Sequence, residues 1–206
     1  MTSRMRAARG IGKDETEASK KVFQTLKKRG HPQDPPPLFS DGWGGIDDAL
    51  LEVYGHIPEY SGHGRPPSRP KPGKNWRYLQ MIKQRDEHGR LKGVKLKAIW
   101  GEKADLIALF GISTAYIERN NLTTRLFNAR LNRKTLAFSK DLTLHEAAIT
   151  WEDAYYNLVR PHKSLRLRNP EAAQSKWIPR TPAVAAKLTD HIWSVKELLM
   201  TIPLKC

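Results

Sequence analysis

Cysteine is nearly absent from this chain of 206 residues, because the only one is Cys206, the last residue. A disulfide within the chain and a zinc site built on cysteines are therefore both excluded. Long apolar runs are also missing: the most apolar stretch, LIALFGI at 106–112, is too short to cross a bilayer. Nothing in the sequence resembles a signal peptide. These absences predict a cytoplasmic protein without membrane contact.

Acidic residues are scarce relative to basic ones, since 36 Lys and Arg stand against 21 Asp and Glu and give a net charge of +15. Nucleic acid is the commonest polyanion that such a basic protein meets. Between Gly62 and Lys103 there are 12 Lys and Arg and only three acids, with Trp76, Tyr78 and Trp100 among them. This combination is typical of a nucleic-acid groove, although a solvated charged face can look the same.

Capping residues and periodicity predict a mixture of helices and strands. Asp14, with Glu17 three residues later, predicts a helix that ends at Gly30. A short apolar run predicts a buried strand that ends at Asp41, and the alternation in VKLKAIW (94–100) predicts one strand of a hairpin. Further helices are expected over 47–55, from Thr114 to about Lys134, from Thr143 to Pro161, and from Thr181 and Ser194.

The helix expected from Thr143 has an apolar stripe at four-three spacing. That spacing predicts a face turned to the core or to a partner helix, whereas two neighbouring acids, Glu152 and Asp153, are expected on the solvent face. The stripe consists of Leu144, Ala148, Trp151, Tyr155 and Leu158.

Glu118 is the only acid between Ile117 and Lys140, a stretch that contains six basic residues. Acids are common in the first turn of a helix, so its position alone favours a structural role. A hard cation such as Mg²⁺, however, is held by one or two carboxylates together with phosphate oxygens of a substrate. Asp41, at the expected strand end, is the candidate for a second carboxylate.

Two sequence blocks resemble a known family. SDGW at 40–43 and YIERNNLTTRLFNARLNRKTLAFSK at 116–140 are similar to the two signature blocks of the insertion-sequence-one family of bacterial transposases. YNLVRPHKSLR at 156–166 resembles the segment after the catalytic helix of integrase-like transposases, and 177–199 resembles the end of larger family members. The resemblance extends over roughly residues 9–200.

The resemblance implies an α/β protein with a partial RNase H-like catalytic core of the DDE group, a β-hairpin insertion and a helical C-terminal tail. It implies DNA strand cleavage and joining by phosphoryl transfer with Mg²⁺ or Mn²⁺. Asp41 would be the second acid of the catalytic triad and Glu118 its glutamate, both as metal ligands. The residues that would bind DNA are Arg119, Asn121, Arg125, Arg133, Lys134, Lys140, Arg160, His162 and Lys163.

The same comparison suggests how the chain is organised. Residues 1–160 would form the catalytic core, with a basic loop and hairpin inserted at 56–103, and residues 161–206 a basic, helical tail. The helix at Asp14 leaves 13 residues ahead of it, fewer than the roughly 20 that three short strands with turns require. The chain is therefore expected to lack the first catalytic aspartate and to be inactive alone, although the active assembly would be a homo-oligomer on DNA. The alternative is a truncated, non-catalytic DNA-binding product.

Overall fold

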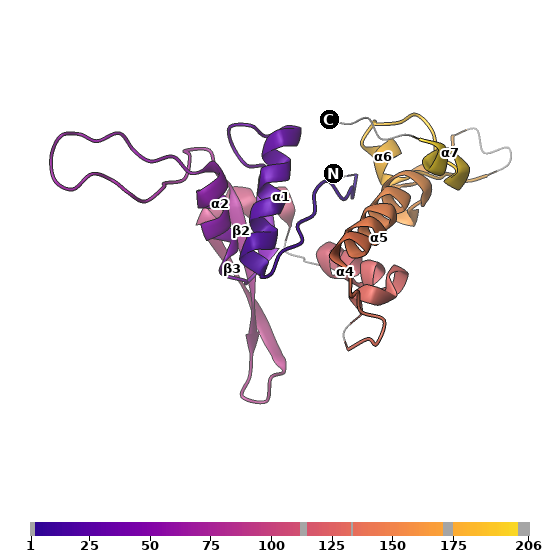
Figure 1. The fold of residues 1–206 in the computed structure, drawn as a ribbon, viewed down its shortest axis with the longest axis horizontal. Coiled ribbons are helices and arrows are strands. Elements are labelled where there is room, and N and C mark those ends of the chain that lie inside the picture. The colour runs from indigo at the N-terminus through magenta and orange to yellow at the C-terminus, as the bar shows by residue number, and fades with distance from the viewer. Residues whose placement is uncertain (1–2, 112–114, 133, 171–174, 202–206) are drawn as a thin grey trace. The chain divides into compact units, whose positions relative to one another are not determined.

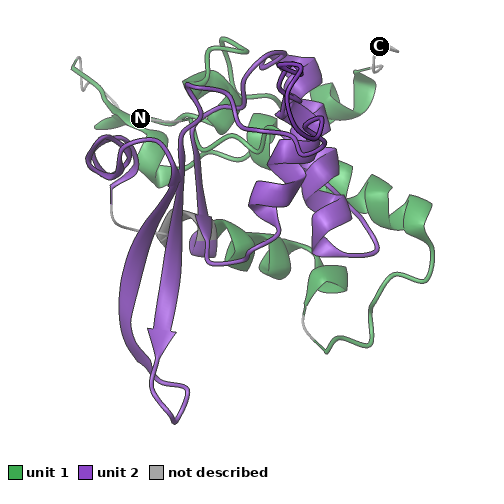
Figure 2. Ribbon diagram, turned by 90° about the vertical axis from the view of Figure 1, so that its left-hand side faces the viewer, with its two compact units in different colours: residues 1–7, 120–206 green, residues 8–119 purple. Residues whose placement is uncertain are grey.

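The computed structural model describes residues 3–111, 115–132, 134–170 and 175–201. The chain forms two compact units, coloured separately in Figure 2: unit 2 comprises residues 8–119, and unit 1 comprises residues 1–7 and 120–206. Unit 1 is thus built from two separate stretches of sequence. The domain boundary expected at residue 160 stays a prediction.

Unit 2 is a mixed α/β structure around a three-stranded sheet. The central strand, β2, pairs in parallel with β1 and antiparallel with β3. Figure 1 shows the β2–β3 hairpin extending away from the helices. The elements of unit 2 are α1 (Glu15–Arg29), β1 (Leu38–Asp41), α2 (Ile46–Tyr54), β2 (Tyr78–Arg85), β3 (Leu91–Trp100), α3 (Lys103–Phe110) and the start of α4 (Ala115–Phe127).

Local sequence signals explain the beginning and the end of α1. The Asp14 side chain accepts a hydrogen bond from the Glu17 backbone N–H at 2.8 Å, which satisfies one of the unpaired donors at the helix start. Gly30 ends the helix with a φ of 153°, a conformation that suits a residue without a Cβ atom. The predictions of this helix, of the strand ending at Asp41 and of the hairpin are all confirmed.

The main core of unit 2 lies between the sheet and the helices α1 and α2. Trp76 and Tyr78 are almost completely buried there, with 2% and 1% of their surfaces exposed. Trp76 contacts Trp100 edge-on at 5.0 Å between ring centroids and donates its indole N–H to Asp34 at 2.9 Å. Trp76 and Tyr78 therefore pack the core, which contradicts their interpretation as part of a nucleic-acid groove, and Trp100 is partly buried against that core. The other members of this core are Phe23, Ala49, Leu50 and Tyr54.

The opposite face of the sheet is covered by α3. Phe39 of β1 stacks on Phe110 of α3 with 5.6 Å between ring centroids, and Leu106 of the same helix is fully buried. Because side chains alternate along a strand, Asp41 points to the same face as Phe39. The sheet is thus enclosed on both faces near β1, and Asp41 stands at the end of the covered region.

Unit 1 is largely helical. It contains the end of α4 and the 13-residue helix α5, both labelled in Figure 1. The α5 helix runs without interruption into a turn of π-helix, and the final helices begin at the caps expected from Thr181 and Ser194. Its elements after α4 are η1 (Ala129–Leu131), α5 (Leu142–Ala154), the π-turn η2 (Tyr155–Val159), η3 (Lys163–Leu165), β4 (Leu167–Arg168), β5 (Trp177–Ile178), α6 (Pro182–Ala185) and α7 (Val195–Met200).

The helix that carries Glu118 is shorter than expected. It ends at Phe127 rather than near Lys134. Asn128 adopts an extended conformation, and its side chain accepts a hydrogen bond from the Arg130 backbone N–H at 3.1 Å. This local bond offers the backbone an alternative to the helical ladder, as asparagine side chains commonly do.

The buried face of α5 is displaced by one residue from the predicted stripe. Trp151 is 42% exposed and Leu144 61% exposed, whereas Ile149 and Glu152 are buried. The prediction that Glu152 lies on the solvent face is therefore wrong. The reason is Arg6, whose guanidinium donates to the Glu152 carboxylate at 2.8 Å. A carboxylate can be buried when a cation is buried beside it.

Candidate functional site

Asp41 is held at the end of β1 by contacts of its neighbours with the central strand. The Ser40 hydroxyl bonds to the Tyr78 hydroxyl at 2.9 Å, and the Gln80 amide donates to the Trp43 carbonyl at 3.0 Å. Between them, a Cβ atom added to Gly42 would come within 3.3 Å of the Ile82 backbone. The SDGW turn is therefore packed closely against β2. These contacts fix the backbone position from which the exposed Asp41 side chain extends.

Burial is the main reason why the pKa of Tyr78 is raised. Its hydrogen bonds with Ser40 and Gln80 oppose this shift, and the carboxylates of Asp47 and Asp41 add to it. Tyr78 is thus a neutral hydroxyl that links β1 to β2 beneath the turn.

Glu118 lies in the first turn of α4 and forms an ion pair with Lys83 of β2. Its side chain is 55% exposed and that of Lys83 is 41% exposed, so the pair is open to solvent and contributes little to stability. Lys83 itself was not predicted as a site residue. No local sequence signal distinguishes it from the other lysines of the hairpin.

The strand register relates Lys83 to Asp41. Asp41 pairs with Met81, and Met81 and Lys83 point to the same face because they are two residues apart on one strand. Two residues of a strand span about 7 Å. Glu118 therefore binds a side chain on the same face of the sheet as Asp41. That side chain, Lys83, is about 7 Å further along β2 than Met81, the residue that pairs with Asp41.

The donor set fits part of a metal site. Two carboxylates on one face can hold a single hard divalent ion when phosphate oxygens complete its coordination. Among the residues that the structure describes, however, no three His, Cys, Asp or Glu side chains gather as a metal-ion site would need. The Glu118 carboxylate is also already paired with the ammonium of Lys83.

Most of the residues predicted to bind DNA are on the surface. Arg119 and Asn121 are exposed on α4, and Arg125 of the same helix is partly buried. Lys134, Lys140 and Lys163 are exposed, and the Arg160 guanidinium lies over the Phe127 ring at 4.2 Å. All of these except Arg119 belong to unit 1. Arg133 lies outside the described residues.

His162 is placed differently from the other predicted DNA contacts. Burial, and then the positive charges of Arg160, Arg4 and Arg6, lower its pKa to about 4. Its ring packs edge-on against Tyr156 at 4.5 Å, and within the described part of the chain its Nε2 atom is buried without a hydrogen-bond partner. His162 is therefore neutral at pH 7 and is a packing residue in this structure.

Sequence reasoning also missed the cluster around Arg6. The guanidinium binds Asp153 at 3.0 Å and Thr124 at 2.7 Å in addition to Glu152, and it lies 4.0 Å from the centroid of the Tyr156 ring. It also donates to Asn120 at 2.9 Å. Arg6 thus joins α4 to α5 within unit 1. These partners lie more than 110 positions away along the chain, so no periodicity or cap could reveal them.

In the comparison with known protein families, the model of the family described as IS1 transposase matches residues 99–157. The resemblance seen in the sequence is confirmed over this segment, which includes Glu118 but not Asp41. No curated protein and no solved structure matches the chain.

None of the helices in the described ranges has the length and apolar character needed to span a membrane.

Proposed function

We propose that this protein acts on DNA in the transposition of a bacterial insertion element, with Asp41 and Glu118 as two ligands of a catalytic metal site in a partial RNase H-like core. The observation that carries the proposal is the approach of Glu118, within the IS1 transposase segment, to the face of the sheet on which Asp41 ends β1. A bound divalent ion would activate water or a 3′-hydroxyl for attack on a phosphate.

The protein's own residues would prepare the DNA for this reaction. Arg119, Asn121 and Arg125 on α4, with the exposed lysines of the following segment, would contact phosphates close to the helix that carries Glu118. Lys83, which neutralises Glu118 in the structure, would donate to a phosphate oxygen when DNA is bound. The charge of +15 would draw the duplex to these surfaces.

A second candidate is a DNA-binding protein that does not cut. A site with two metal ions requires ligands beyond Asp41 and Glu118, and no three His, Cys, Asp or Glu side chains of the described residues gather as such a site would need, which favours this candidate. We accordingly expect the isolated chain to bind DNA and to leave its strands intact. The two candidates share their DNA-binding surfaces and differ only in the chemistry at Glu118.

The test combines a binding and a cleavage measurement on the full chain. Fluorescence anisotropy with labelled duplexes of native and scrambled sequence should show little sequence preference and an affinity that falls steeply with salt. Incubation of DNA bearing element ends with Mg²⁺ or Mn²⁺ should yield no cut strands. Salt-insensitive binding would refute the role on DNA.

Glu118→Gln and Lys83→Gln complete the design. Metal-dependent cleavage that Glu118→Gln abolishes, while duplex binding persists, would establish the catalytic candidate and refute our expectation of an inactive chain. Lys83→Gln is the control for loss of the ion pair itself. It should leave any cleavage less affected than Glu118→Gln, because it removes no metal ligand.

A further inference from the structure

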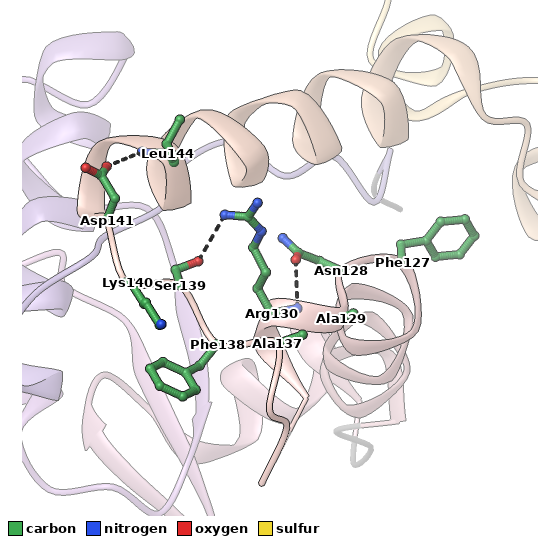
Figure 3. A pocket seen from close by; sticks show the side chains of 10 residues that line it. All are labelled: Phe127, Asn128, Ala129, Arg130, Ala137, Phe138, Ser139, Lys140, Asp141 and Leu144. Carbon is green, nitrogen blue, oxygen red and sulfur yellow. Dashed lines mark hydrogen bonds between the residues drawn. The ribbon is translucent and has the colours of Figure 1, made fainter.

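Unit 1 contains a pocket of which the proposed function uses only one lining residue, Lys140. It has a volume of about 470 Å³ and lies between the end of α4, the following segment and the start of α5. Figure 3 shows Arg130 rising through its centre, with Phe138 and Lys140 on one side and Phe127 on the other. Its size is within the range of pockets that hold small organic ligands.

The walls of the pocket present apolar surface that the fold leaves uncovered. Phe127 is 53% exposed, Phe138 59% and Leu144 61%. Such side chains normally find a place in the core, and aromatic residues gain most from being buried. Three of them around one hollow indicate a surface that a ligand covers.

The charges of the pocket indicate what that ligand is. Arg130 and Lys140 line it, and neither forms an ion pair with an acid among the described residues. Arg130 is instead oriented by the Ser139 hydroxyl, at 3.4 Å, which bonds in turn to His145 at 2.9 Å. The acid of the lining, Asp141, caps α5 by accepting the Leu144 N–H at 2.8 Å.

We propose that this pocket binds an unpaired nucleotide of the DNA on which the protein acts. A base would stack on the exposed ring of Phe138, while Arg130 and Lys140 bind the adjoining phosphates. The faces of a paired base are covered by its neighbours, so only an unpaired nucleotide can offer a face to an aromatic ring. Lysine is depleted at the core of protein–protein contacts, which makes Lys140, without an ion pair among the described residues, a poor fit to a protein partner.

This inference rests on the proposed function, because it presumes that the protein meets DNA. The test therefore compares two probes on the full chain: a blunt duplex, and the same duplex with a short unpaired 3′ thymidine tail. The unchanged protein should bind the tailed duplex more tightly. Phe138→Ala should weaken binding of the tailed duplex about fivefold or more, in line with the loss of one stacked base, and leave the blunt duplex unaffected.

Two further variants separate stacking from charge and from general surface effects. Arg130→Gln should also weaken binding of the tailed duplex more than binding of the blunt duplex. The slope of log affinity against log salt concentration should fall by the amount expected for the loss of about one phosphate contact. Leu136→Ala is the matched control, since Leu136 is 97% exposed on the same segment but does not line the pocket. It should bind both probes as the unchanged protein does.

The possible results have distinct meanings. Equal binding of both probes, with Phe138→Ala silent, would overturn the pocket proposal and leave the role on DNA intact. Absence of binding to either probe would refute the proposed function itself. If Phe138→Ala instead reduced self-association in sedimentation experiments and left tail binding unchanged, the surface would be a protein contact and the proposal would be wrong.

Discussion

Replacing Arg6 by methionine should destabilise unit 1 strongly. The Arg6 side chain is only 8% exposed, and its partner carboxylates on Glu152 and Asp153 are 10% and 20% exposed. Methionine retains much of the length and apolar contact of arginine but removes the cation that pairs with the Glu152 carboxylate. Removing one member of a buried ion pair costs about 3–5 kcal/mol.

The lower end of that range applies here, because Asp153 retains some contact with water. We expect a loss of about 3 kcal/mol in the free energy of unfolding. In addition, Oε2 of Glu152 is already buried without a partner in the described part of the chain, so loss of Arg6 also removes the hydrogen bond to Oε1. For a unit of about 100 residues this corresponds to a fall in Tm of more than 10 °C.

Thermal and urea unfolding, followed by circular dichroism, measure the effect, with Arg168→Met as control because Arg168 is exposed on β4. A double-mutant cycle with Glu152→Gln isolates the pair, and the double variant should lose at least 1 kcal/mol less than the two single losses added together. The reasoning is refuted if Arg6→Met lowers the Tm no more than Arg168→Met does, or if the two losses are simply additive.

Two other predictions concern the SDGW turn and the histidine of unit 1. Gly42→Ala should cost about 1 kcal/mol because its methyl group meets the Ile82 backbone at 3.3 Å, whereas Gly44→Ala, with no atom within 4 Å, should be neutral; equal urea midpoints for the two variants would contradict this. The folded-state pKa of His162, about 4, lies below its ordinary 6.5, so the unfolded chain binds the proton more readily. The stability that neutral His162 contributes is complete above about pH 6.5 and is lost as the pH falls towards 4. His162→Phe should remove about 1–2 kcal/mol of this pH dependence, since the ring is only half-buried, and an unchanged profile of Tm against pH would show that another group titrates.

Elements with local signals could be predicted from the sequence, and elements fixed by distant partners could not. Asp14 and Gly30 delimit α1 through their own backbone contacts, and the alternation of residues 94–100 is a property of one strand. The burial of Glu152, by contrast, depends on Arg6, which lies 146 positions away. The aromatic residues among the lysines were misread for a similar reason, because only the packing of α1 and α2 shows that Trp76 and Tyr78 are covered.

The candidate site also has features that the sequence predicted and features that depend on distant contacts. The end of β1 at Asp41 and the place of Glu118 in the first turn of α4 agree with the sequence prediction. The ion pair between Glu118 and Lys83 joins residues that are 35 positions apart, and it depends on how α4 approaches the sheet. The sequence pattern thus predicted which acids would be available, and the fold determines which cation one of them meets.

The division of unit 1 between residues 1–7 and 120–206 has a consequence for the order in which the protein matures on the ribosome. All of unit 2 is synthesised before the second stretch of unit 1, so its sheet and helices can form while Arg6 still lacks its partners. Asn157, whose side-chain amide bonds to both the N–H and the carbonyl of Arg6 at 3.0 Å, comes 151 positions later. Arg6 is therefore synthesised long before its native partners, and a nascent chain stalled before Asn157 should leave the Arg6 segment open to proteases.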